Sequence, residues 1–379
     1  MDLMKFLERT GNKNHTKGTA MRTAMFDTLE PRSLLSASPT VSSAGSATAE
    51  SHFTVLAATK QSKTTLKIAK TSAYGSAVTI SAAVQPKSGT GVPTGTVTFY
   101  AQGPAQGGSQ ASVAIGTGTL NSQGVARISI STFSVGSQQI YAEYNGSGKF
   151  QFSRTPAVTH YTTPAASTTK LSITTPTSTL IGNPTGMLAR VGSTVNGVTP
   201  TGRVAFYDGG TLLGSKAVDA NGHARWLANY LYIGTHQLKA IYLGNTQLLG
   251  HRSPVRDVTV GLPTMTTTSD GLKVGQVTAG SGGVVATTGD TITAHYTLYV
   301  NGVKNQSSLD SGQPFSFHLN NNEVIAGFDE GLAGVTAGEK RVLIVPPSLG
   351  YGNRPQGNIP PNSTLVFVVD VLNVTQNPS

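Results

Sequence analysis

The segment at residues 93–100 reads PTGTVTFY, and a later segment at residues 200–207 reads PTGRVAFY. In both copies apolar residues alternate with polar or small ones, as in a strand that buries one face. A second matching pair, residues 136–144 and 234–242, shares a Gly, a Gln, an Ala and a closing Tyr. An offset of about 100 residues is the length of a whole domain rather than of a solenoid repeat. The middle of the chain is therefore predicted to hold two copies of one all-β domain.

Turn signals separate the alternating segments in both copies. Residues 121–124 read NSQG and residues 219–222 read DANG, and such quartets favour tight turns. Short strands with regular turns over about 100 residues predict immunoglobulin-type sandwiches. The motifs also resemble those of the bacterial Ig-like repeat family, over about residues 62–163 and 168–260. A spacer and an adhesin both remain open as the role of the pair.

Composition excludes several classes of site. The chain has 379 residues and no cysteine, which excludes disulfides, thiolate zinc sites, iron–sulfur clusters and cysteine nucleophiles. Charged residues make up 12%, against about 25% in an average protein. No apolar run approaches the length of a membrane-spanning helix, so the sequence predicts no transmembrane segment.

The net charge of +10 is unevenly distributed. Residues 51–163 carry 8 basic and 1 acidic residue, whereas residues 271–379 carry 5 and 7. The Lys and Arg residues of the repeats are scattered among Thr and Ser without interleaved aromatics. We expect no nucleic-acid partner, and at most weak attraction to an anionic cell surface.

The N-terminal part of the chain, residues 1–60, is expected to be a disordered export or sorting segment and linker. Residues 39–50 are nearly all Ser, Ala and Thr and bury little surface. Residues 26–37 read FDTLEPRSLLSA, which resembles the Leu-Glu-Pro-Arg-x-Leu-Leu segment near the N-terminus of many bacterial surface proteins. That resemblance implies export, although a plain disordered tail is the alternative. Residues 161–167 and 263–268 are expected to be extended linkers between domains.

A different pattern begins near Gly271. Alternating or apolar segments predict strands at residues 291–300, 315–319, 341–345 and 365–371. One short helix is predicted at residues 324–332, capped by Asn322, because Val324, Ile325, Phe328 and Leu332 share a face. Strands around one apolar helix predict an antiparallel α+β domain. The whole chain is thus expected to be mainly β, with Ig-like domains at 61–163 and 164–262 and an α+β domain at 263–379.

Motifs in this last domain resemble those of FKBP-type peptidyl-prolyl isomerases. They follow one another in family order and spacing as AHYT at 294–297, PFSFHL at 314–319, EVIAGFDEG at 323–331, PSLGYG at 347–352 and IPPNSTLVF at 359–367. The resemblance implies a shallow apolar pocket for a prolyl ring, with no cofactor and no metal. Carried over by position, its lining is Tyr296, Phe315, Val324, Ile325, Phe328, Tyr351, Ile359 and Phe367.

The resemblance also implies roles within this pocket. Phe328 lies where many members have Trp, so it would form a smaller floor under the ring. The Ile325 N–H and the Tyr351 hydroxyl would bind substrate carbonyls. Asn305 and Gln306 replace the family's Phe-Asp pair. Gln306 can still form hydrogen bonds but carries no charge, and the loss of the Phe removes part of one wall. The pocket is therefore expected to be more open and its affinity lower.

These observations predict a peptidyl-prolyl cis-trans isomerase acting on proline-containing polypeptides outside the cytoplasm, secreted or at the cell surface. The alternatives are a catalytically weak module that binds proline segments, and an adhesin carried by the Ig-like repeats.

Overall fold

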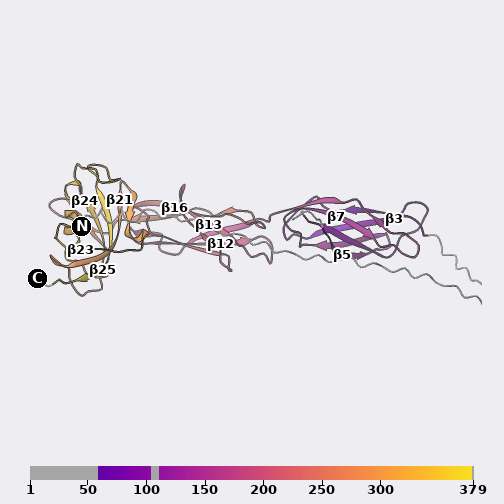
Figure 1. Ribbon diagram of the computed structural model, residues 1–379, viewed down its shortest axis with the longest axis horizontal. Coiled ribbons are helices and arrows are strands. Elements are labelled where there is room, and N and C mark those ends of the chain that lie inside the picture. Colours follow the sequence, from indigo (N-terminus) through magenta and orange to yellow (C-terminus); the bar gives the residue numbers. More distant parts are fainter. Residues whose placement is uncertain (1–58, 104–110, 378–379) are drawn as a thin grey trace, which may run out of the picture.

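The computed structural model describes residues 59–103 and 111–377. Three β-rich domains follow one another in a row, with the C-terminal domain at one end (Figure 1). The predicted mainly β architecture, two Ig-like sandwiches and one α+β domain, is confirmed. The export-like motif at residues 26–37 lies outside the described residues. Neither described range contains a helix with the length and hydropathy needed to span a membrane.

The first domain is a sandwich of two sheets. One sheet has the order β1(Ser62–Lys67), β3(Val78–Pro86), β6(Val125–Ile130). The other has the order β2(Thr71–Ala73), β9(Val158–Thr163), β7(Gly136–Tyr144), β4(Thr96–Gln102), β5(Ser112–Thr119), with β8(Ser153–Arg154) paired to β7.

The second domain repeats this topology. Its smaller sheet has the order β10(Ser167–Ile173), β12(Thr185–Ser193), β15(His223–Ala228). Its larger sheet has the order β11(Ser178–Leu180), β18(Arg256–Gly261), β16(Gly234–Tyr242), β13(Arg203–Asp208), β14(Thr211–Ala217), with β17(His251–Arg252) paired to β16.

The repeated motifs meet inside each sandwich. Tyr144 donates a hydrogen bond from its hydroxyl to the Thr94 carbonyl over 2.7 Å, and Tyr242 bonds to the Thr201 carbonyl over 2.6 Å. Both tyrosine rings are fully buried. The closing Tyr of one motif thus satisfies a backbone group in the Pro-Thr-Gly segment of the other, as buried polar groups require.

The third domain wraps one antiparallel sheet around a helix. The sheet order is β19(Met265–Thr267), β20(Lys273–Thr278), β24(Lys340–Val345), β25(Leu365–Thr375), β21(Thr291–Val300), β22(Val303–Ser307), with β23(Phe315–His318) paired to β21. The helix is α2(Ala326–Leu332), and two 3₁₀ turns are η1(Ser308–Asp310) and η2(Pro347–Leu349). Helix α2 lies close against β24, because a Cβ on Gly331 would come within 2.6 Å of Leu343.

Two details of the helix prediction are wrong. The helix begins at Ala326 with Ile325 as its N-cap residue, so Val324 and Ile325 are not helical. Asn322 has a left-handed backbone, with φ of 56°, and does not cap the helix. Asn favours such conformations in turns. The chain therefore reaches α2 through a tight turn, and Ile325 keeps an extended backbone with ψ of 148°.

The predicted linkers are also largely wrong. Residues 161–163 belong to β9, residue 167 opens β10, and residues 265–267 form β19. Thr- and Ser-rich segments fit strands with one exposed face, which the linker interpretation overlooked. Only residues 164–166 separate the first two domains, and Gln247 donates a hydrogen bond to the Tyr74 hydroxyl across that junction over 2.8 Å.

The second domain provides a test of its packing through Gly214. A Cβ at this position would overlap the ring of Trp226, the single tryptophan of the chain. We expect Gly214→Ala to destabilise this domain by about 1–3 kcal/mol, because the new Cβ forces the Trp226 ring out of its packed position. Urea unfolding followed by Trp226 fluorescence measures the change. Gly210→Ala, where a Cβ meets open space, is the control, and equal midpoints for the two variants would contradict the prediction.

Candidate active site

An apolar cavity lies between the sheet and the helix of the third domain. It is lined by Tyr296, Val324, Ile325, Phe328 and Phe367, and it is shallow. Strands β21 and β25 supply Tyr296 and Phe367, and α2 supplies Phe328. The non-helical segment before α2 supplies the two aliphatic residues. The carbon-rich lining makes this cavity suitable for an apolar ring rather than for an ion.

Edge-to-face contacts hold the aromatic rings in place. The Phe328 ring lies 5.1 Å from Phe367 at 74° and 5.5 Å from Phe317 at 61°, between ring centroids. Tyr296 lies 6.1 Å from Phe315 at 80°. Such arrangements stabilise aromatic pairs beyond the burial of their area. Phe328 is 5% exposed, so the base of the cavity is a packed ring.

The other predicted pocket residues lie in the same apolar cluster. Ile359 is 4% exposed, and Phe315 and Tyr351 are half-buried against the cluster. The structure thus brings all eight predicted residues together, and five of them line the cavity. The substrate-binding roles of Ile325 and Tyr351 remain predictions.

Asn305 and Gln306 lie on the edge strand β22 and do not line the cavity. Gln306 is paired with Leu298, whose side chain is in the core, and directly paired residues share a face of the sheet. Gln306 therefore lies on the pocket side of the edge. Asn305 is exposed at a register shift, where Lys304 already pairs with Tyr299. The two replaced positions thus differ, because only Gln306 faces the pocket side.

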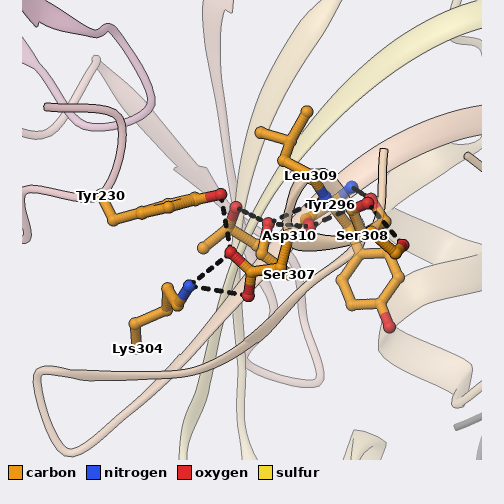
Figure 2. A network of polar contacts seen from close by, with 9 residues as sticks. Tyr230, Tyr296, Lys304, Ser307, Ser308, Leu309 and Asp310 are labelled. Atoms are coloured by element: carbon orange, nitrogen blue, oxygen red, sulfur yellow. Dashed lines mark hydrogen bonds and ion pairs between the residues drawn. The ribbon is translucent and has the colours of Figure 1, made fainter. Parts of the chain in front are cut away.

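A rim network that the sequence did not indicate holds the backbone of Tyr296 (Figure 2). Ser308 Oγ accepts a hydrogen bond from the Tyr296 N–H over 2.9 Å and lies 3.0 Å from His295 Nδ1. Ser307 Oγ donates to the Tyr296 carbonyl over 3.0 Å and accepts from the Leu309 N–H over 3.3 Å. The Ser-Ser pair after Gln306 was the one sequence feature that could have indicated this network. Its partners on Tyr296 follow only from the pairing of β21 with β22.

The second Ig-like domain contacts this rim through Tyr230 (Figure 2). The Tyr230 hydroxyl donates to Asp310 Oδ1 over 2.9 Å. Lys304 Nζ lies 2.7 Å from each Asp310 oxygen and 3.9 Å from the centre of the Tyr230 ring. A residue of one domain therefore helps to hold the turn η1 of another.

The outer face of the third domain's sheet packs against the same Ig-like domain. Tyr299 is 1% exposed, and its ring lies 5.1 Å from the ring of Tyr232. Val366 and Val368 are buried in the core cluster of the second domain. Lys340 Nζ donates to the Gly182 carbonyl over 3.2 Å. The pocket is thus formed on one face of a sheet whose other face is covered by a neighbouring domain.

Burial governs the electrostatics of the pocket. Desolvation raises the pKa of Tyr296 to about 12, with a smaller contribution from Tyr351. The Tyr296 hydroxyl is therefore neutral throughout the physiological range. Within residues 59–103 and 111–377, no three His, Cys, Asp or Glu side chains group closely enough to hold a metal ion.

We expect Tyr230→Phe to loosen the rim without unfolding either domain. The variant removes the hydroxyl that donates to Asp310 and keeps the ring beside Lys304, at a cost of about 1 kcal/mol for one hydrogen bond. Hydrogen exchange at the Tyr296 and Leu309 amides should accelerate about fivefold. Tyr207→Phe is the control, because Lys239 Nζ also lies over that ring, at 5.6 Å. Unchanged exchange at both amides would show that Tyr230 does not support the rim.

The raised pKa of Tyr296 predicts a loss of stability at high pH. Between pH 10 and 12 the unfolded state releases the phenolic proton while the folded state retains it, so stability falls as pH rises. The expected slope from this residue is about 1.4 kcal/mol per pH unit. Urea unfolding at pH 9, 10 and 11, followed by methyl NMR signals of core residues such as Leu343, measures it. Tyr296→Phe should show a shallower decline, and parallel curves would contradict the assignment.

Comparison with known proteins gives the same result for each domain. Residues 282–372 match the family model of FKBP-type peptidyl-prolyl cis-trans isomerases, and residues 64–163 and 171–261 match that of the bacterial Ig-like domain (group 3). FK506-binding protein 2 of Dictyostelium discoideum is 43% identical over 118 residues, which are 30% of this chain and 89% of that protein.

Two further relatives differ in how much of them is matched. FK506-binding protein 1 of Saccharomyces cerevisiae is 43% identical over 105 residues, 27% of this chain and 92% of that protein. Peptidyl-prolyl cis-trans isomerase FKBP14 of Homo sapiens is 44% identical over 97 residues, 24% of this chain and 44% of that protein. The chain belongs, through its C-terminal domain, to the family of FKBP-type peptidyl-prolyl cis-trans isomerases, and it carries two bacterial Ig-like domains of group 3 ahead of that domain.

Proposed function

We propose that this chain catalyses rotation about Xaa-Pro bonds of exported or surface polypeptides by desolvating the bond in the cavity of Tyr296, Phe328 and Phe367. The observation that carries the proposal is the packed aromatic lining of this cavity. A prolyl ring is apolar and of a size that a few aromatic side chains can surround.

The proposed mechanism follows from the electronic structure of the amide. Resonance gives the C–N bond a rotation barrier of about 18–20 kcal/mol. In the twisted transition state this resonance is lost and the carbonyl is less polar, so water stabilises the planar ground state more. An apolar pocket withdraws that stabilisation and favours the twisted state by comparison. Rotation by this route requires no nucleophile and no general base.

Backbone and hydroxyl groups at the cavity are suited to orient the substrate. Ile325 precedes α2 with an extended backbone, and N–H groups at the start of a helix lack partners within the helix. We assign its N–H to one substrate carbonyl and the Tyr351 hydroxyl to another. These contacts would fix the peptide on one side of the prolyl bond while the other side turns.

A location outside the cytoplasm is the second part of the proposal. Two Ig-like domains in a row before the isomerase domain suit a spacer that holds it away from a surface (Figure 1). The basic excess of residues 51–163 suits an anionic surface. The export-like motif at residues 26–37 supports the same location.

Gln306 favours one competing function, a module that binds proline segments with little catalysis. It occupies the pocket side of the edge strand without a charge, so polarisation of the rim is weaker than a carboxylate would give. Activity measurements separate the two functions.

The test is cis–trans exchange of an Xaa-Pro tetrapeptide, measured by NMR with the full chain. We expect clear acceleration, and a loss of about fivefold in kcat/KM for Tyr351→Phe, the value of about one hydrogen bond. Tyr207→Phe in the second domain should leave the rate unchanged. No acceleration by the folded chain would rule out the isomerase function and leave the binding module.

The same assay tests the edge strand. Gln306→Asp should raise kcat/KM, because it places a charge on the pocket side of β22. Asn305→Asp adds the same charge at the exposed bulge and should have no effect. Equal responses of the two variants would show that the position of the charge is unimportant.

A further inference from the structure

A second cavity lies on the Ig-like domain next to the isomerase domain. It is a groove of about 400 Å³, and the residues that form most of its wall are Leu213, Lys216, Trp226, Leu227, Tyr230 and Leu231. Strands β14 and β15 form its sides, and each is the outermost strand of its sheet. The groove therefore runs along the open edge of the sandwich. Leu227 is 52% exposed and the neighbouring Leu212 is 56% exposed, so apolar surface faces solvent here.

The first Ig-like domain serves as an internal control for this groove. Phe99 pairs with Gly116 as Phe206 pairs with Gly214, so Gly116 and Gly214 are equivalent and residues from there on are 98 positions apart. Ile128, Ser129 and Thr132 of the first domain correspond to Trp226, Leu227 and Tyr230. The same fold thus carries smaller or polar residues where it does not contact the isomerase domain. A domain that serves only as a spacer does not require an exposed Leu beside half-buried Trp and Tyr side chains.

The groove lies beside the turn η1, which is next to the residues that hold the Tyr296 backbone. Tyr230 forms part of its wall, and the hydroxyl of Tyr230 bonds to Asp310 in η1 (Figure 2). Asn229 lines both the groove and a crevice that also contains Leu309 and Tyr296. The crevice also contains Tyr299 and Val368, so it lies on the face of the sheet that packs on the Ig-like domain, whereas the isomerase cavity lies on the other face. The turn η1 lies next to both, because Asp310 bonds to Tyr230 in the groove wall and Ser308 holds the Tyr296 backbone.

We infer that this groove binds an apolar segment of the same polypeptide whose Xaa-Pro bond enters the isomerase pocket. The inference rests on the proposed isomerase function. The wall is made mainly of Leu, Trp and Tyr side chains, which match leucine-like side chains of an unfolded chain. Orienting a sugar would require several polar groups, which this wall largely lacks. Binding at a second site raises the local concentration of the proline segment, and a longer substrate therefore binds more tightly.

The test compares two substrates of the full chain that share one Xaa-Pro site. One is a tetrapeptide, and the other is a longer Trp-free peptide with leucine-rich segments on both sides of that site. We expect the long peptide to have a KM about tenfold lower. Leu227→Ser, which introduces the residue of the first domain, should raise that KM about fivefold and leave the tetrapeptide unaffected. Val113→Thr, an exposed apolar position on the first domain (61% exposed), is the matched control and should change neither KM.

Trp226 provides an independent readout, because it is the only tryptophan in the chain and lines the groove. Titration with the long peptide should shift its fluorescence, and Leu227→Ser should weaken that titration by the same factor as it changes KM. Normal turnover of the tetrapeptide with no fluorescence shift and no preference for the long peptide would show that the groove does not bind substrate. The isomerase function would be unaffected by that result. A shift that depends on protein concentration alone would assign the groove to a second copy and also overturn the inference. If the tetrapeptide is not turned over, the isomerase function fails, and the fluorescence titration still decides whether the groove binds the peptide.

Discussion

The second half of strand β21, residues 296–300, is buried on both faces, and the arrangement of the C-terminal half depends on that constraint. Successive side chains of a strand point to opposite sides, so Tyr296 enters the pocket while Tyr299 packs on the neighbouring domain. Each face of the strand therefore needs its own apolar side chains, one set for the pocket and one for the neighbouring domain. The strand thereby links the position of a pocket residue to the docking of the second Ig-like domain. The paired strand β22 carries the same link further, because Ser307 and Ser308 hold the Tyr296 backbone.

In the proposed function, the pocket acts through its apolar packing rather than through a reactive group. Phe328 is held by ring edges from two strands, and the neutral Tyr296 hydroxyl adds no charge. A dry, rigid wall of this kind suits a reaction whose barrier is the loss of amide resonance. The edge strand carries Asn305 and Gln306, of which only Gln306 lies on the pocket side of the sheet.

The two Ig-like domains share a topology and differ in surface. Their cores keep the same Tyr-to-carbonyl hydrogen bond, at Tyr144 and at Tyr242. Outside the core, the second domain replaces small side chains with Trp226, Leu227 and Tyr230. The second copy contacts the isomerase domain, through residues that include Tyr230 and Tyr232. The two copies therefore differ in sequence on the surface beside the isomerase domain, while their fold is the same.

The sequence by itself determined the fold class, the internal repeat and the set of apolar residues in the pocket. Alternating patterns, such as that of residues 291–300, and motifs in a fixed order can be recognised from consecutive residues, without knowing which segments contact one another. It failed at residues 161–163 and 265–267, because Thr-rich segments that read as linkers become strands only through their partners. For residues 161–163 these partners are distant strands, and for residues 265–267 the partner is the next strand, β20. Asn322 failed as a cap because its turn is set by packing before α2. The contact of Tyr230 with Asp310, 80 residues apart, and the groove beside it exist only once two domains are docked, and tertiary structure alone decided them.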